Sequence, residues 1–361
     1  MGVALLWPQT EVPPATPGGK VLLQPADAAV LAATDARRDL PCVLTHWAPE
    51  LGFDSQFHSG YSVRVPLREL AGGGDVLRIL MRVSSHERPD ATVYLSDRFP
   101  VPPIGEGASG EATLPGSFVV DSGRSRVDWL MRDRAGRVCS AHWELKTPKA
   151  PPARREPGRQ LRVKILLHFA PQRSGEADVL LAMLRGIARE PGIGRFSLTV
   201  FHAARRRVLF RRDDAPAIDF PALDEALDGF EPLLVDYRQL QENNGEGRFL
   251  ADLLEGTEAD DAVIFVGPKL GTDPRSPAAL PAPRRPVFYL SYTYDPLAND
   301  PLSNPGRDAV AVLVKALHGR VYTISRPDEM AAAWRDLLRR LSPPPAYTAE
   351  RSPGQTASGT R

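Results

Sequence analysis

The stretch KILLHFAPQRSGEAD, residues 164–178, holds a histidine, a serine and an aspartate in close succession. His168 lies at the end of an apolar run, and Ser174 and Asp178 follow it within ten residues. A Ser-His-Asp triad needs a histidine that is hydrogen-bonded to both partners, and three residues on one loop and one helix start do not readily reach that geometry. The chain also lacks a G-x-S-x-G elbow. The favoured interpretation of His168 is therefore a strand-end histidine with its own internal partner.

The other residues that could do chemistry are scattered along the chain. The histidines show no H-E-x-x-H spacing, so a zinc enzyme is unsupported. The glycine clusters at 72–75 and 191–194 lack the strand-loop-helix context of phosphate-binding loops. Acidic pairs such as Asp260-Asp261 have the ordinary interpretation of exposed charge before a buried strand, because glycoside hydrolysis needs two carboxyls across a cleft. We predict no catalytic residue and no cofactor.

The sequence contains two cysteines, Cys42 and Cys139. Structural zinc needs clustered ligands, so this pair does not form a metal framework and no metal site is predicted. The pair is compatible with one disulfide within the N-terminal domain, and equally with two separate buried thiols.

Charge and hydropathy limit the kinds of partner. The formal net charge is +1, which gives no field that favours nucleic acid. No stretch approaches the roughly 20 apolar residues that span a bilayer. The apolar start MGVALLW has no basic leader and is interrupted by Pro8, so we do not interpret it as a signal peptide, although a truncated start is compatible with it. Localisation stays open between secreted or periplasmic and cytoplasmic.

The first part of the chain predicts an all-β domain. Residues 1–41 form a lead-in that is expected to be partly disordered. Residues 42–147 contain short alternating runs such as YSVRVPL, DVLRILMRVSS and SRVDWLMRD, bounded by Gly, Pro, Asp or Ser, which is typical of an antiparallel immunoglobulin-like or fibronectin-like sandwich. RDRAGRVCSAHWELK predicts a hairpin that turns at Ala135-Gly136.

The second part alternates strand and helix patterns. Residues 148–160 are rich in Pro and Arg and are expected to be a linker. Buried runs such as RVKILLHF and DAVIFVGP alternate with helical periodicity over 161–341, which predicts a doubly wound, mainly parallel α/β sheet of Rossmann-like type. Residues 342–361 have the composition of a disordered tail.

Several of these segments together resemble a known family. The von Willebrand factor A domain has segments similar to four in this chain: RVKILLHF, DAVIFVGPKLGTDP, PVFYLSY and the terminal LVKALHGRVYTISRPDEMAAAWRDLLRRL. The order of the last three resembles that in bacterial VWFA-related proteins. The resemblance covers about residues 160–341. It implies a von Willebrand factor A-like fold for that half of the chain.

The family holds a cation in a metal-ion-dependent adhesion site made of Asp, Ser and Thr oxygens, which suit a hard divalent ion. Here His168 falls where the family has its first Asp, and Ala170 and Gln172 fall at its two Ser positions. Pro268 occupies the acidic position after the central strand, with Lys269 beside it. The resemblance therefore implies a degenerate site without a metal.

We predict a non-enzymatic protein-binding, scaffold or adhesion-type protein that recognises another protein. Ligands of such α/β sheets lie beyond the carboxyl ends of the strands, so the predicted contacts are in the loops there. They are His168, Gln172, Arg173, Ser174, Asn243, Asn244, Lys269 and Asp273. Two alternatives stay open. One is a hydrolase-type enzyme with its site in the same crevice. The other is a cation-dependent adhesin whose metal ligands are misaligned here and lie at other positions than His168, Ala170, Gln172 and Pro268.

Overall fold

The computed structural model of the chain describes residues 10–11, 23–71, 76–88, 92–148, 160–171, 175–228, 230, 245–255, 259–272, 285–293 and 307–341. About half of the predicted lead-in, most of the predicted linker and the whole predicted tail lie outside these residues. The chain divides into two compact units, residues 1–158 and 159–361. Each unit is described by itself.

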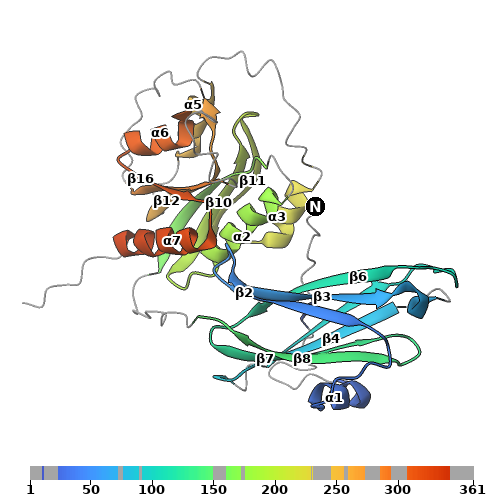
Figure 1. Cartoon of the computed structure of the whole chain (residues 1–361). Helices are drawn as coiled ribbons and strands as arrows, with labels where there is room; N and C mark the ends of the chain where they lie inside the picture. Colours follow the sequence, from blue (N-terminus) through green and yellow to red (C-terminus); the bar gives the residue numbers. More distant parts are fainter. Residues whose placement is uncertain are drawn as a thin grey trace, which may run out of the picture. The chain divides into compact units, whose positions relative to one another are not determined.

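The first unit is built from antiparallel strands (Figure 1). Its strands are β1 (Thr10–Glu11), β2 (Val43–Leu51), β3 (Phe57–Pro66), β4 (Val76–Ser85), β5 (Val93–Pro100), β6 (Glu111–Val120), β7 (Arg124–Arg132) and β8 (Val138–Lys146). They form a five-stranded sheet, in the order β1-β5-β4-β7-β8, and a three-stranded sheet, β2-β3-β6. Its helices are α1 (Pro25–Ala32) and the short 3-10 helix η1 (Leu67–Leu70).

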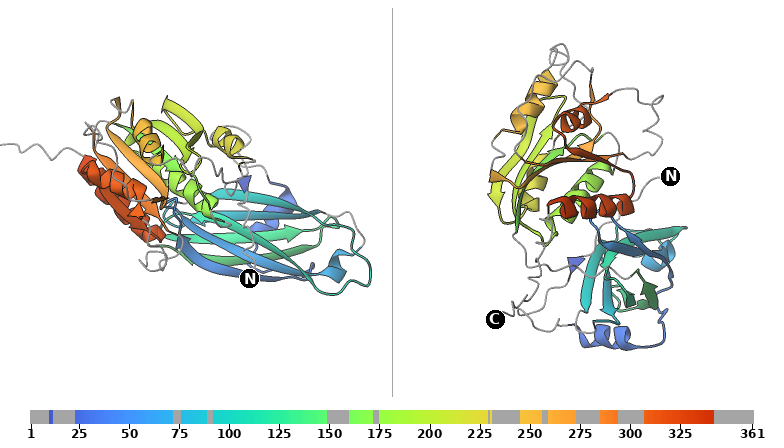
Figure 2. Two further views of the ribbon diagram at one scale, coloured as in Figure 1. Left: turned by 90° about the horizontal axis from the view of Figure 1, so that it is seen from above. Right: turned by 90° about the vertical axis from the view of Figure 1, so that its left-hand side faces the viewer.

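The two sheets of the first unit form two layers around one core (Figure 2). Alternate residues of each strand point inward, as the period of two requires. Tyr61 of β3 and Trp129 of β7 are 0% and 1% exposed and meet edge to face, with ring centroids 5.4 Å apart. Trp143 of β8 belongs to the same core and is 7% exposed.

A disulfide joins the two sheets at one side of the sandwich. Cys42, the residue before β2, is bonded to Cys139 of β8. The segment before Cys42 also pairs with β8, since Leu40 N donates to Val138 O and Ser140 N donates to Arg37 O. The structure thus decides between the two states that the sequence left open.

The second unit contains the following elements. Its strands are β9 (Leu161–His168), β10 (Ile193–His202), β11 (Arg207–Ala215), β12 (Ala262–Pro268), β13 (Gly271–Thr272), β14 (Val287–Tyr292), β15 (Arg307–Asp308) and β16 (Arg320–Ile324). Its helices are α2 (Glu176–Ala188), α3 (Phe220–Leu227), α5 (Gly245–Leu253), α6 (Ala309–Ala316) and α7 (Pro327–Leu341).

A six-stranded mixed sheet forms the centre of the second unit. Its order is β11-β10-β9-β12-β14-β16. The edge strand β11 runs antiparallel to β10, and the other neighbours are parallel. Buried side chains of α5 and α6 share a core with β9, β10, β12 and β14. Apolar runs in these strands agree with burial of a parallel sheet.

The predicted fold class is wrong. Strands take up 45% and helices 25% of the described residues, and they form antiparallel sheets and one mixed sheet, which is not a doubly wound, von Willebrand factor A-like arrangement. The prediction gave too much weight to the strand-helix alternation after residue 160. It gave too little to the eight strands of the first unit and to the β10–β11 hairpin.

Candidate functional site

β9 carries His168 to the carboxyl edge of the six-stranded sheet and buries its ring there. The residue is 3% exposed, and its ring lies against Phe201 with centroids 5.3 Å apart. His168 Nδ1 lies 3.4 Å from Pro268 O. Because a carbonyl oxygen only accepts, Nδ1 carries the hydrogen of a neutral ring. Burial lowers the pKa of His168 to about 4, so the ring is uncharged at neutral pH.

Gly267 closes the gap between β9 and β12 at this edge. Its φ is +147°, and a Cβ atom there would lie 2.6 Å from the backbone oxygen of His168. Glycine is required both by the backbone conformation and by this close approach. The backbones of the two central strands therefore lie close together at their carboxyl ends.

Aromatic rings lie beside this contact, at the end of β10. His202 is 6% exposed and lies 5.4 Å from the ring of Phe230, which in turn lies 6.2 Å from Phe169. The guanidinium of Arg205 lies over Phe230 at 4.9 Å, a cation–π contact. Burial, together with the charge of Arg205, lowers the pKa of His202. The ring layer is thus uncharged, with one cation on its outer side.

The structure brings two of the predicted binding residues to this edge. His168 contacts Pro268, and the half-buried Lys269 follows it in the chain. His168 offers almost no surface to a partner. The other predicted residues lie outside the described part of the chain: Gln172, Arg173, Ser174, Asn243, Asn244 and Asp273. Their role stays a prediction.

Asp308 is a carboxylate at this edge that the sequence reasoning missed. Its Oδ1 accepts hydrogen bonds from Val310 N, Ala311 N and Leu270 N at 3.1, 3.3 and 3.4 Å. Burial raises the pKa of this carboxyl. Its oxygen is used to cap α6. Across the described ranges there is no group of three or more His, Cys, Asp or Glu side chains that could hold a metal ion.

A second polar cluster lies near the amino ends of the strands. Lys164 of β9 is 4% exposed, and its Nζ donates to Glu255 O at 3.1 Å. Ser197 of β10, its neighbour in register, donates to Asp260 Oδ1 at 3.3 Å. Burial lowers the pKa of Lys164 and raises that of Asp260. The signal for this cluster was one lysine inside the apolar run RVKILL.

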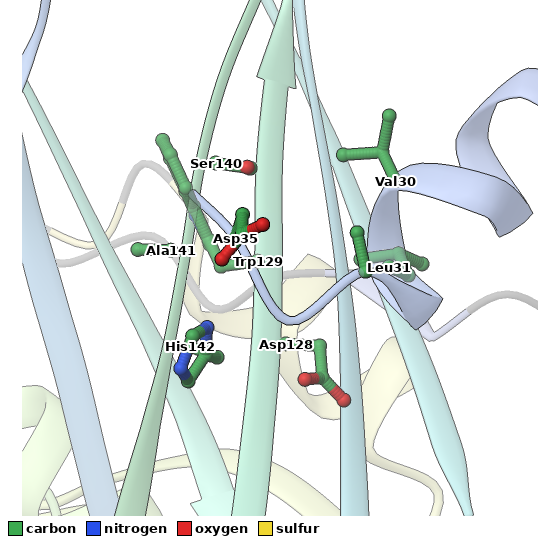
Figure 3. A pocket seen from close by; sticks show the side chains of 9 residues that line it. Val30, Leu31, Asp35, Asp128, Trp129, Ser140, Ala141 and His142 are labelled. Carbon is green, nitrogen blue, oxygen red and sulfur yellow. The ribbon is translucent and has the colours of Figure 1, made fainter. Parts of the chain in front are cut away.

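A small hollow opens between the end of α1 and strands β7 and β8 (Figure 3). It is lined by Val30, Leu31, Ala33, Asp35, Asp128, Trp129, Ser140, Ala141 and His142. Asp128 accepts hydrogen bonds from the guanidiniums of Arg82 and Arg126, and Ser140 Oγ accepts from Arg37 N. Since these polar groups are paired internally, the hollow does not make a convincing ligand site.

The outer side of the three-stranded sheet is different in character. The register and the alternation of the strands place thirteen side chains there, which we call the β2–β3–β6 face. They are Val43, Thr45, Trp47, Glu50, His58, Ser62, Arg64, Pro66, Glu111, Thr113, Pro115, Ser117 and Val119. Val43 and Val119 are 47% and 44% exposed, which is unusual for large aliphatic side chains.

The middle of the β2–β3–β6 face has no charged side chain. Trp47 lies over Gly60, where an added Cβ would be 2.2 Å from the indole. Thr45, Ser62 and Pro115 form the next row. Ionisable side chains lie toward the two ends, where Arg64 pairs with Glu111 at 3.1 Å, His58 Nε2 lies 2.8 Å from Asp54 Oδ1, and the exposed Glu50 lies opposite His58.

The outer side of the five-stranded sheet offers a contrast within the same unit. Its apolar side chains Leu80 and Leu130 are covered by α1. Its polar positions carry an ion network in which Asp128 pairs with Arg82 and Arg126. Outward faces of sandwiches are ordinarily polar in this way. The β2–β3–β6 face therefore departs from the local pattern.

Comparison with known proteins gives no relative in sequence. No family model matches the chain, and no curated protein matches it. The resemblance to the von Willebrand factor A family stays untested at the sequence level.

Solved structures give only faint likenesses. A superoxide reductase (neelaredoxin) from Ignicoccus hospitalis matches with a TM-score of 0.19 and 16% identity, covering 34% of this chain and 89% of that one. A putative ApaA protein from Bordetella pertussis matches with 0.18 and 13%, over 30% of this chain and 95% of that one. A β-glucosidase from Listeria innocua matches with 0.19 and 13%, over 30% and 16%. At this level their names say nothing about what this chain does.

Helix length and hydropathy bear on the membrane. Among the helices that the structure describes, none is long and apolar enough to cross a bilayer. This agrees with the prediction of no membrane-spanning segment.

Proposed function

We propose that the protein binds another protein through the β2–β3–β6 face. The observation that supports this is the combination of exposed Val43 and Val119 with Trp47 on a surface whose middle is uncharged. The centres of protein interfaces are depleted of charged residues and enriched in tryptophan. Val43 and Val119 flank this middle, in register with Arg64 and His58, so exposed apolar side chains lie along the whole length of the face.

The partner should present a flat and mainly uncharged surface. The rows of Thr45 and Trp47 hold no charged side chain, so a buried charge on the partner would exchange its hydration for a few neutral hydrogen-bonding groups at most. The internally paired Arg64 and His58 lie toward the ends, where an interface has its polar rim.

A binding role also agrees with the chemistry at the carboxyl edge of the six-stranded sheet. Asp308 is occupied with backbone N–H groups, and His168 is buried against Phe201. An active site of acid-base type would instead hold a base within reach of a reacting group. We therefore place recognition on the first unit.

The test uses the full chain with a photo-crosslinking amino acid at one position. We expect the probe at Val119 to crosslink one protein from an extract of the native host, in a fixed ratio. The probe at Val76, 38% exposed on β4, should not do so. The captured protein is then purified, and its affinity for the full chain is measured directly.

Substitutions decide whether the face itself carries the affinity. Val119→Asp places a charge on the face and should weaken binding at least about tenfold, since one unpaired interfacial charge costs several kcal/mol. Val76→Asp is the matched control and should bind as the unchanged chain does. Equal affinity of both variants would refute the proposal, as would binding of a polysaccharide at Trp47 in place of a protein.

A further inference from the structure

The Cys42–Cys139 disulfide anchors the strand that carries much of the β2–β3–β6 face. Cys42 directly precedes Val43, the first residue of β2, and Cys139 belongs to β8 of the other sheet. β2 lies at the edge of its sheet and has β3 as its strand neighbour. The disulfide and the stacking of His46 on Trp143, with centroids 5.0 Å apart, tie β2 to β8.

A guanidinium lies beside one sulfur of this disulfide. Arg38 Nη1 is 3.8 Å from Cys139 Sγ. The same nitrogen donates to Arg37 O at 2.8 Å and to Ser140 O, so it is held in this place by the backbone. A cation next to a sulfur stabilises the thiolate that forms there when the bond is cut.

The two sulfurs differ in access. Cys139 is 0% exposed, whereas Cys42 is only partly buried. A thiolate of a dithiol reductant would attack Cys42 Sγ, form a mixed disulfide there, and release Cys139 Sγ as the thiolate beside Arg38. The second thiolate of the reductant then attacks the reductant's other sulfur, the one bonded to Cys42 Sγ, and releases Cys42 as a thiolate. Two electrons and two protons pass from the dithiol to the two cysteines, and the dithiol becomes a cyclic disulfide.

We propose that this disulfide is a redox control on the β2–β3–β6 face, and that Arg38 assists its reduction. Cutting the bond removes the covalent anchor of β2, so the strand that carries Val43 and Trp47 opens more often. In the oxidised protein β2 stays paired and the β2–β3–β6 face is intact. In the reduced protein β2 detaches more often and the face is disrupted. The link to partner binding rests on the proposed function, whereas the chemistry at the disulfide does not.

The first experiment measures reduction of the full chain by dithiothreitol under native conditions. Free thiols are alkylated at intervals and counted by mass spectrometry. Arg38→Gln should slow the reduction about three- to tenfold, because the leaving thiolate loses its neighbouring charge. The matched control is Arg37→Gln, whose guanidinium pairs with Asp39. Equal rates in the two variants would overturn the role of Arg38.

The second experiment asks whether β2 responds to the bond. Hydrogen exchange is compared between oxidised protein and protein whose reduced cysteines are blocked by alkylation. Amides of β2 should exchange at least about tenfold faster after reduction, while those of β9 in the second unit should not change. Unchanged exchange in β2 would contradict the redox control, whatever the result for binding.

The third experiment uses the partner identified through Val119. Its affinity should fall at least about tenfold on reduction in the unchanged chain, and reduction should have no effect in Val119→Asp, which already binds weakly. A rise in β2 exchange without loss of affinity would place the partner elsewhere and refute the proposed function alone. Unchanged exchange together with unchanged affinity would refute the redox control alone.

Discussion

At the scale of single residues, two buried polar side chains of the second unit's sheet are accommodated in different ways. His168 is neutral and shares its hydrogen with Pro268 O, and Lys164 donates to a backbone carbonyl. A buried group that must stay neutral makes stability depend on pH. His168 is the clearest case, because its pKa is lowered to about 4 from an ordinary value of 6.5.

We expect the second unit to lose stability as the pH falls from 6.5 toward 4. In that window the unfolded chain binds a proton on His168 that the folded chain does not, so unfolding takes up protons and acid favours it. Above pH 6.5 His168 is neutral in both the folded and the unfolded chain, so this effect does not reduce the stability there. The loss by pH 4 is about 3 kcal/mol, since one pKa unit corresponds to about 1.4 kcal/mol.

Urea titrations at several pH values, read by pulsed hydrogen exchange of β9, measure this loss. The control is His168→Phe, which keeps a ring against Phe201 and cannot titrate. Its dependence on pH should be distinctly shallower. Equal slopes in the two proteins would show that His168 does not carry the effect.

The sequence indicated some of these residues but not their surroundings. The end of the run RVKILLHF placed His168 at a strand end, and an internal partner for it was expected. The partner, Pro268, is 100 residues away in the chain and could not be identified from local patterns. Lys164 stands out in the sequence as a charged residue in an apolar run. Ser197 and Asp260 lie near it only because β9, β10 and β12 pair in the folded sheet.

At the scale of elements, local signals predicted well where they act locally. The turn at Ala135-Gly136 joins β7 and β8, and Gly136 has a φ of +83°. The closing helix α7 begins at Pro327, as the fixed backbone angle of proline favours, and has Asp328 and Glu329 in its first turn. After α6 it is His318, and not the glycine that follows it, that takes the left-handed conformation, with a φ of +56°.

Gly319 is needed there for another reason. A Cβ at this position would be 2.3 Å from Val287 O, on the neighbouring strand β14. The glycine allows the chain to enter β16 close to β14. A contact of this kind depends on tertiary structure, so local sequence patterns do not reveal it.

We expect Asp308→Ala to destabilise the second unit by about 1–2 kcal/mol, the usual cost of losing an N-cap. The backbone N–H groups of Val310, Ala311 and Leu270 lose their acceptor. Asp308→Asn is the matched control, because asparagine caps as well as aspartate does. Thermal unfolding followed by hydrogen exchange of α6 measures both, and equal losses in the two variants would contradict the capping role.

At the scale of the whole molecule, the two units differ in how much the sequence revealed. The apolar alternation of the first unit indicated strands, but the pairing of its two sheets connects segments far apart in the chain. The two cysteines are 97 residues apart, so their spacing alone could not decide between a bond and two thiols. The balance of strand and helix was misjudged for the same reason, since the sheets are assembled by long-range contacts.

We expect loss of the disulfide to destabilise one unit and spare the other. Cys42→Ser combined with Cys139→Ser should cost the first unit about 2–5 kcal/mol, the usual range for a native disulfide. Differential scanning calorimetry should show the transition of the first unit moving down while that of the second stays in place. A shift of both transitions together would mean that the units unfold as one.

The buried amine of Lys164 has a further consequence. Acylating reagents need a deprotonated and accessible amine; burial lowers the pKa of Lys164 and so favours the neutral amine, but the side chain is 4% exposed and its Nζ is hydrogen-bonded to Glu255 O, so lack of access alone prevents the reaction. In the folded state it is protected, and once exposed it becomes an ordinary lysine. The exposed Lys146 of the first unit supplies an internal reference in the same sample. The rate of acylation at Lys164 relative to that at Lys146 therefore measures how often the central sheet opens.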